Sequence, residues 1–210
     1  MAQLIIFSYF EDLNNWNFMP LVQLWRQEWT KAGFKCHCLG RHLAQKHPKY
    51  KVFLKHVDSL PTINPKNYEV ACYMRWLAMA HFMEQQRIER ALMSDFDVFP
   101  RGFNRQHMGS AQIVVHERTR VPCLVEATIQ GAANITQMIM SRIPKPGVTH
   151  YSDMYAFKET SWPATNHCVQ LDDPTWTKAA AVHASHGACL RLQPGKAKID
   201  VIKEIVLGQK

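Results

Sequence analysis

The chain of 210 residues lacks any long apolar run, because no stretch approaches the roughly 18 apolar residues that a membrane-spanning helix needs. This argues against a helical membrane protein. The segment 1–7 has neither a basic leader nor a small-residue cleavage site, so it predicts a first strand and not a signal peptide. We therefore expect a cytoplasmic protein, located in the host cytoplasm if its source is a virus.

Paired metal-binding cysteines are also missing. The six cysteines are scattered through the chain and none forms a Cys-x-x-Cys pair, which argues against a structural zinc site. Free, mostly buried thiols in a reducing compartment are the better interpretation. The sequence has no internal repeat and no low-complexity tract.

Acidic residues are scarce in one part of the chain. The net charge is +8, and between residues 35 and 66 seven Lys and Arg face the single acid Asp58. Such a stretch favours a polyanionic partner, although a solvated basic face without a partner fits equally well. The aromatic residues there are not regularly interleaved, as they are in proteins that bind single-stranded nucleic acid.

The apolar patterns that are present predict strands alternating with helices in a single domain over 1–210. Continuous apolar runs without alternation are typical of strands covered on both faces. We expect an α/β fold, a three-layer sandwich with a mostly parallel central sheet. The expected strands are 4–9, 34–39, 91–93, 111–116, 122–128 and 179–182; the expected helices are 20–31, 67–86, 135–142 and 154–158, with a small-residue turn at 130–134.

The strand at 91–93 leads into two acids one residue apart, Asp95 and Asp97. In an extended segment alternate side chains share a face, so we expect both carboxylates on one side and Phe96 on the other. Two acids leaving a buried strand together repel each other unless a cation lies between them. A divalent ion with oxygen ligands, Mg²⁺ or Mn²⁺, suits this pair, and two solvated turn acids are the alternative.

The longest predicted helix carries one formal charge between residues 70 and 83, namely Arg75. Its apolar residues surround the helix almost completely, which is typical of a buried helix. A buried arginine needs an anion, and the aspartates of the next strand or a ligand phosphate are the candidates. The alternative is that the side chain extends past its neighbours to solvent.

Taken together in chain order, these features resemble the GT-A fold, DxD-containing glycosyltransferases that use nucleotide sugars, in their compact bacterial or viral form. The resemblance spans most of the chain and rests on short motifs: Arg75-Trp76, Ser94-Asp95-Phe96-Asp97, Gln130-Gly131-Ala132, Ser152-Asp153-Met154 and the segment 182–187 around two histidines.

The resemblance implies a divalent metal, Mn²⁺ or Mg²⁺, that bridges the diphosphate of a donor such as a UDP-sugar. Its ligands would be Asp95, Asp97 and His183, with Asp97 the stronger ligand and Asp95 also in contact with the sugar and ribose. His186 is the second candidate histidine and would otherwise contact phosphate. Residues 1–100 would form the nucleotide-sugar half and residues 101–210 the acceptor half.

The resemblance implies further contacts with the donor and acceptor. Tyr9 or Phe10 would stack on the base, although core packing explains them as well, and Gly131 would lie beside the donor. Arg75 would neutralise Asp95 or the donor. An inverting enzyme needs a carboxylate base to deprotonate the acceptor hydroxyl. Asp153 is the first candidate and Glu126 the second, while a retaining enzyme would need no such base.

The expected function is transfer of a sugar to a hydroxyl of a glycan or of a hydroxymethylated DNA base, with the basic region 35–66 near the acceptor. Three rivals remain. A nucleotidyltransferase would carry a Gly-rich loop after its first strand, and residues 8–12 contain no glycine. A metal-dependent nuclease would need further acids close to Asp97, and the next thirteen residues contain none. A non-catalytic nucleic-acid-binding module would leave the buried acids and Arg75 without a role.

Overall fold

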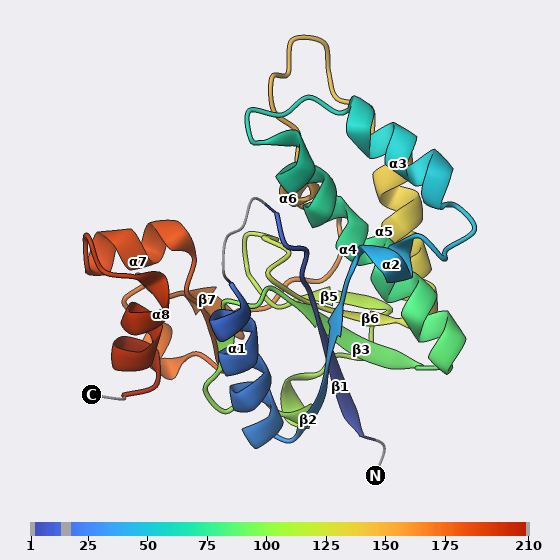
Figure 1. The fold of residues 1–210 in the computed structure, drawn as a ribbon. Coiled ribbons are helices and arrows are strands. Elements are labelled where there is room, and N and C mark those ends of the chain that lie inside the picture. The colour runs from blue at the N-terminus through green and yellow to red at the C-terminus, as the bar shows by residue number, and fades with distance from the viewer. Residues whose placement is uncertain (1–2, 14–17, 209–210) are drawn as a thin grey trace.

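A computed structural model describes residues 3–13 and 18–208 (Figure 1). Its main sheet has five strands in the order β2-β1-β3-β6-β5, and a second sheet has three in the order β4-β8-β7. The main-sheet strands are β1 (Leu4–Tyr9), β2 (Phe34–Leu39), β3 (Arg90–Ser94), β5 (Ile113–Val115) and β6 (Leu124–Thr128). The second sheet consists of β4 (Val98–Pro100), β7 (Cys168–Gln170) and β8 (Ala181–His183).

The α/β class is confirmed, but the prediction of a mostly parallel sheet is wrong. Strands β2, β1 and β3 pair in parallel, whereas β6 pairs antiparallel with both β3 and β5. The cause is the connection between β5 and β6. Residues 116–123 are too few for the crossover that a parallel pair requires, so β6 must return beside β5 in the opposite direction.

Helices cover both faces of the main sheet, which gives three layers. One face packs against α4 (Lys66–Gln86) and α5 (Ile129–Ser141), with α2 (Arg41–Ala44), α3 (Tyr50–Ser59) and α6 (Asp153–Lys158) around them. The other face packs against α1 (Met19–Lys31), the second sheet, α7 (His186–Leu192), α8 (Lys198–Val201) and a π-helical turn (Ile202–Val206). Short 3₁₀ turns lie at Arg105–His107 and Trp176–Lys178.

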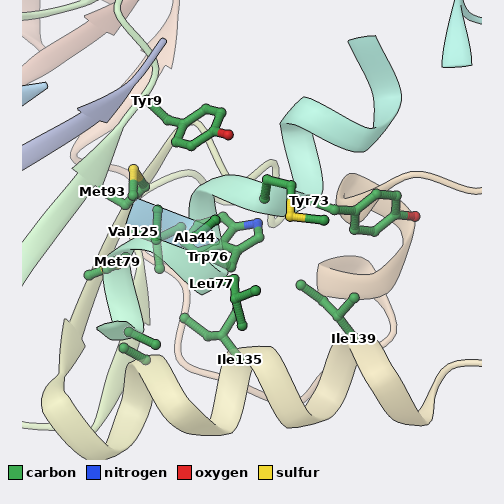
Figure 2. Packing of buried hydrophobic residues seen from close by; sticks show 14 of the residues in the cluster. Tyr9, Ala44, Tyr73, Trp76, Leu77, Met79, Met93, Val125, Ile135 and Ile139 are labelled. Carbon is green, nitrogen blue, oxygen red and sulfur yellow. The ribbon is translucent and has the colours of Figure 1, made fainter. Parts of the chain in front are cut away.

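Helix α4 is the central element of the first apolar core, as its nearly all-round apolar pattern predicts. Trp76 and Leu77 are 1% exposed or less: Leu77 lies beside Ile135 of α5 (Figure 2), and the Trp76 ring packs on Phe157 of α6 with ring centroids 4.8 Å apart. On the sheet side the same core includes Met93 and Val125. The helix is thus held on two sides, and this fixes the direction in which its polar residues point.

The first β-α-β unit has the predicted boundaries to within one residue. Gly33 ends α1 with a φ of +89°, a backbone conformation that glycine adopts without the steric cost of a Cβ atom. The chain then enters β2, which lies parallel to β1 as expected.

Helix α5 begins earlier than predicted. Thr128 caps it by accepting a hydrogen bond from the Gly131 N–H at 3.0 Å, so residues 130–134 are helical and do not form a turn. The small residues serve close packing instead. A Cβ atom on Gly131 would lie 2.2 Å from the backbone oxygen of Gln112.

No helix among the described residues is both long enough and apolar enough to cross a membrane.

Candidate metal and donor site

Asp95 and Asp97 lie in a tight turn between β3 and β4. The Val98 N–H donates to the Asp95 carbonyl at 3.1 Å and closes the turn, and the Asp95 N–H donates to the Cys123 carbonyl at 2.9 Å. The expectation of an extended segment is therefore wrong at this point. The turn nevertheless brings the two carboxylates together, because it reverses the chain between them.

The third member of the group, His183, comes from the end of β8. This strand pairs antiparallel with β4, which places His183 opposite Val98, and the Ala184 N–H donates to the Asp97 carbonyl at 2.9 Å. The His183 Nε2 lies 3.3 Å from Asp97 Oδ1 and 3.9 Å from Asp95 Oδ2. One ligand atom from each of the three residues lies within 4.8 Å of the others.

Gln170 on β7 fixes the ring of His183 from its other side. Its amide lies 2.7 Å from His183 Nδ1, and its Oε1 is a buried oxygen with no hydrogen-bond partner among the described residues. Rotating the amide lets Oε1 accept a hydrogen bond from Nδ1–H. Once the Nε2 proton is displaced, the lone pair of Nε2 is directed at the two acids, which is the tautomer that a metal-binding histidine needs.

The residues present fit a divalent metal ion. Asp97 Oδ1 is buried, has no well-formed hydrogen bond among the described residues, and has His183 Nε2 as a neighbour at 3.3 Å, so a cation bound by both atoms would satisfy it. Two carboxylates and one imidazole suit Mn²⁺, which accepts both oxygen and nitrogen ligands, while a site with this much carboxylate also admits Mg²⁺.

The charges in the group shift its pKa values in different directions. Burial raises the pKa of Asp97, but Lys198 and His183 outweigh it and hold that pKa below its usual range. Burial raises the pKa of Asp95, Arg75 offsets this only in part, and the charge of Asp97 adds to the increase. Burial lowers the pKa of His183, but the Asp97 carboxylate raises it well above its usual range. A metal ion at Nε2 must therefore displace a proton.

Arg75 links the two acidic parts of the site. The prediction that it pairs with an aspartate at the end of the next strand is confirmed, since its Nη1 forms an ion pair with Asp95. Its Nη2 and Nε lie 2.6 Å and 3.1 Å from Asp153 Oδ2, and Trp76 Nε1 donates to the same oxygen at 3.0 Å. Asp153 is 5% exposed, and its known donors all converge on Oδ2.

Sequence reasoning missed three residues close to this group. Lys198 on α8 forms an ion pair with Asp97 Oδ2. Cys72 and Tyr68 lie on the same face of α4 as Arg75, one and two turns before it respectively, and the Tyr68 hydroxyl is within hydrogen-bond reach of the Cys72 thiol. Their helical spacing relative to Arg75 was the available signal for Tyr68 and Cys72. No motif marked Lys198.

Glu126 lies apart from the acidic group, in a separate buried network. Its Oε1 pairs with Arg90, its Oε2 accepts from the Gly109 N–H at 2.8 Å, and His116 Nε2 lies 3.3 Å away. Burial raises the pKa of Glu126, but the hydrogen bonds from His116, Gly109 and Arg90 bring it below its usual value. These contacts tie β3, β5 and β6 together and suit a structural role.

The two aromatic residues expected at the base differ in their surroundings. Tyr9 is 9% exposed and belongs to the first core, with its hydroxyl bonded to Glu11. Phe10 is half-buried, and its ring lies 6.3 Å from that of Phe96 in an edge-on contact. Phe96 also packs on Phe18, with the ring centroids 5.5 Å apart.

Two further predicted residues lie outside the acidic group. Gly131 is buried in the first turn of α5, where close packing explains it. His186 is exposed at the start of α7, three residues beyond His183, and does not belong to the group of possible metal ligands.

The basic region 35–66 folds into β2, α2, α3 and their connections. Two of its charges are used within the fold: Arg41 pairs with Glu11 at 2.8 Å, and Lys66 Nζ donates to the carbonyls of Asp58 and Leu60 at 2.7 Å. Five exposed lysines of this region remain, which are Lys35 on β2 and Lys46, Lys49, Lys51 and Lys55 in and around α2 and α3.

Comparison with known proteins gives a fold match and no sequence match. No protein-family model matches the chain, and no protein of curated function matches it in sequence. A glycosyltransferase involved in the glycosylation of the major capsid of PBCV-1 superposes with a TM-score of 0.54 at 8% identity, covering 98% of this chain and 100% of that one. The structure is that of a GT-A fold.

Mouse xyloside xylosyltransferase 1, in its apo form, superposes with a TM-score of 0.52 at 10% identity, covering 89% of this chain and 98% of that one. At these identities the similarity concerns the fold alone. The resemblance to GT-A glycosyltransferases in the sequence motifs is thus matched by the fold of the described residues, and this chain brings two aspartates and a histidine together where a metal ion could bind.

Proposed function

We propose that the protein is a metal-dependent glycosyltransferase that moves a sugar from a nucleotide-diphosphate sugar, with a UDP-sugar favoured, to an acceptor hydroxyl. The observation that carries this proposal is the convergence of Asp95, Asp97 and His183 at the carboxyl end of β3 in a GT-A fold. Ligands lie at this end of the strands in open α/β sheets, because the strands end there and the loops diverge.

In this proposal Asp97 and His183 hold the metal, and Asp95 contributes a weaker contact. Arg75 already neutralises Asp95, so Asp95 is better placed than Asp97 to accept hydrogen bonds from hydroxyls of the ribose or the sugar. When bound, the metal supplies a Lewis acid for the negative charge that develops on the leaving diphosphate. Phe10 is the better candidate for the base contact, since Tyr9 is committed to the core.

Asp153 is the proposed base if the reaction inverts the configuration of the sugar. Arg75 and Trp76 hold its Oδ2, so Oδ1 is the atom that would accept the proton of the acceptor hydroxyl. Hydrogen bonds from a guanidinium weaken a carboxylate as a base. The same geometry therefore also suits a role in which Asp153 orients a sugar hydroxyl and no base is needed, as in a retaining enzyme. Glu126 is not part of the proposal because its carboxylate is enclosed elsewhere.

The acceptor is proposed to be a glycan, with a hydroxymethylated DNA base as the alternative. Both structural neighbours favour the glycan, since one is involved in capsid glycosylation and the other is named a xyloside xylosyltransferase. The four exposed lysines between Lys46 and Lys55 favour an anionic acceptor and keep the DNA alternative open. Residues 1–100 remain the proposed donor-binding half and residues 101–210 the proposed acceptor-binding half. The proposed metal ligand His183 nevertheless comes from the acceptor-binding half.

The test is a screen of UDP- and GDP-sugars with Mn²⁺, in which release of the nucleoside diphosphate is measured. Each donor that is turned over is then offered with glycan and with hydroxymethylated DNA acceptors. We expect metal-dependent turnover of at least one UDP-sugar, and loss of turnover when Mn²⁺ is removed with a chelator. If no nucleotide sugar is hydrolysed or transferred with any divalent metal, the proposed function is wrong.

A further inference from the structure

The ammonium group of Lys198 binds the carboxylate of Asp97, the same side chain that a metal in the group of Asp95, Asp97 and His183 would use. Lys198 is the first residue of α8, 101 residues beyond Asp97, and its Nζ forms an ion pair with Asp97 Oδ2. The side chains are only 18% and 13% exposed. Solvent therefore screens this ion pair much less than a surface pair.

The contact between Lys198 and Asp97 follows from the packing of the C-terminal segment and is not a chance contact between two surface side chains. The residues that follow it anchor the C-terminal segment in the second core, since Val201, Ile202 and Val206 are at most 6% exposed. Arg101 Nη1 also donates to the Val206 carbonyl at 3.2 Å. The backbone of Lys198 is thus fixed, while its four-carbon side chain can reorient.

Charge counting shows what a metal would change. Asp95, Asp97 and Asp153 carry three negative charges within the site, and Arg75 and Lys198 supply two positive ones. These five groups leave one net negative charge once His183 has lost the proton that a metal at Nε2 must displace. A divalent ion would reverse the sign and place a second cation on the carboxylate that Lys198 already holds. The site with the metal bound would thus carry a net positive charge, which the negatively charged diphosphate of the donor would neutralise.

We propose that Lys198 competes with the divalent metal for Asp97, so that the metal binds weakly alone and tightly together with a nucleoside diphosphate. This inference rests on the proposed function, because it takes Asp97 as a metal ligand. The diphosphate gives the displaced ammonium a new anion and offsets the positive charge of the metal. Lys198 thereby couples metal binding to donor binding and disfavours a site that holds the metal alone.

The test is isothermal titration calorimetry of the full chain with Mn²⁺, without and with saturating UDP. We compare the wild type with Lys198→Met and with Lys203→Met, a control that removes an exposed lysine from the same C-terminal segment. Removing a like charge a few ångström from the metal is expected to strengthen the binding of Mn²⁺ alone by about tenfold or more. The gain in Mn²⁺ affinity that UDP produces should shrink by a similar factor in Lys198→Met and stay unchanged in the control.

A second readout does not depend on calorimetry. Without Mn²⁺, Lys198→Met removes the lysine partner of Asp97, leaves only His183 beside this carboxylate and should lower the Tm, while added Mn²⁺ should raise the Tm more than it does in the wild type. If Lys198→Met does not fold, Lys198→Gln keeps a polar side chain of similar reach and is measured in its place.

The outcomes separate the inference from the proposed function. If Mn²⁺ binds Lys198→Met no more tightly than the wild type, the competition is refuted while the metal site stands. If no variant binds Mn²⁺ with or without UDP, the metal site itself is refuted, and with it both the proposed function and the inference.

Discussion

Replacement of Arg75 by Met is the change whose effect on stability follows most directly from the structure. Arg75 is 8% exposed and is the shared partner of two carboxylates, Asp95 and Asp153. Met fills most of the same volume, so the substitution removes charge and hydrogen bonds and creates little empty space. The two acids would be left facing each other across the site, with Trp76 as a remaining donor to Asp153.

The magnitude can be estimated from this geometry. Removal of one partner from a buried ion pair costs about 3–5 kcal/mol, mainly because a buried charge is left uncompensated. In a chain of this size each kcal/mol lowers the Tm by about 2–4 °C, so Arg75→Met should lower the Tm by roughly 6–20 °C. Arg75→Lys keeps the charge but cannot bridge both carboxylates, so its Tm should lie between those of Arg75→Met and the wild type.

The assay is thermal and urea-induced unfolding followed by circular dichroism at neutral pH. The double variant Arg75→Met/Asp153→Asn is the informative comparison, because it removes one of the uncompensated charges. It should therefore recover part of the lost stability. An Arg75→Met protein that unfolds within about 1 kcal/mol of the wild type would refute the reasoning, since it would show that the arginine is not a necessary counterion.

Three further predictions concern single residues. Gln170→Ala removes the group that orients His183 and should weaken Mn²⁺ binding by about 10–100-fold in calorimetry, whereas an unchanged affinity would contradict the orienting role. Glu126→Gln should lower the Tm at pH 7, because the pKa of Glu126 is depressed in the fold; its contribution is present above the unfolded pKa of about 4.3 and lost as the pH falls through the folded value. The difference in Tm from the wild type should thus narrow below about pH 4, and a constant difference would exclude this cause. Gly131→Ala should destabilise the chain by about 1–3 kcal/mol in urea unfolding because its Cβ meets the backbone of the neighbouring loop, and a more stable variant would show that α5 can shift.

Strands β1 and β2 and helix α4 could be predicted from the sequence because the order of apolar and polar residues within each segment indicates its secondary structure. A continuous apolar run predicts β1 with its observed boundaries, the segment after the first helix is correctly predicted as β2, and the all-round apolar pattern predicts α4 to within one residue. Arg75 could be matched with an aspartate partner because a buried charge requires one. The direction of β6 was missed, although the short segment 116–123 already excluded a parallel crossover.

The parts that could not be predicted depend on long-range packing. A lone lysine at the start of a short C-terminal helix carries no signal that it reaches Asp97, because only the folding of α8 onto the second core brings them together. The small residues around Gly131 suggested a turn, yet the same residues suit a helix that packs closely on a neighbouring backbone. Local composition does not distinguish the two.

The central claim is that the turn between β3 and β4 binds a metal that serves sugar transfer. Its most direct test is the Mn²⁺-dependent turnover of the best UDP-sugar by Asp97→Ala and Asp95→Ala, with Asp58→Ala as a control at an exposed acid in α3. We predict that Asp97→Ala loses about 10²-fold or more in rate together with its Mn²⁺ dependence, that Asp95→Ala is also impaired, and that the control is unchanged. Turnover that survives in both Asp97→Ala and Asp95→Ala would contradict the account.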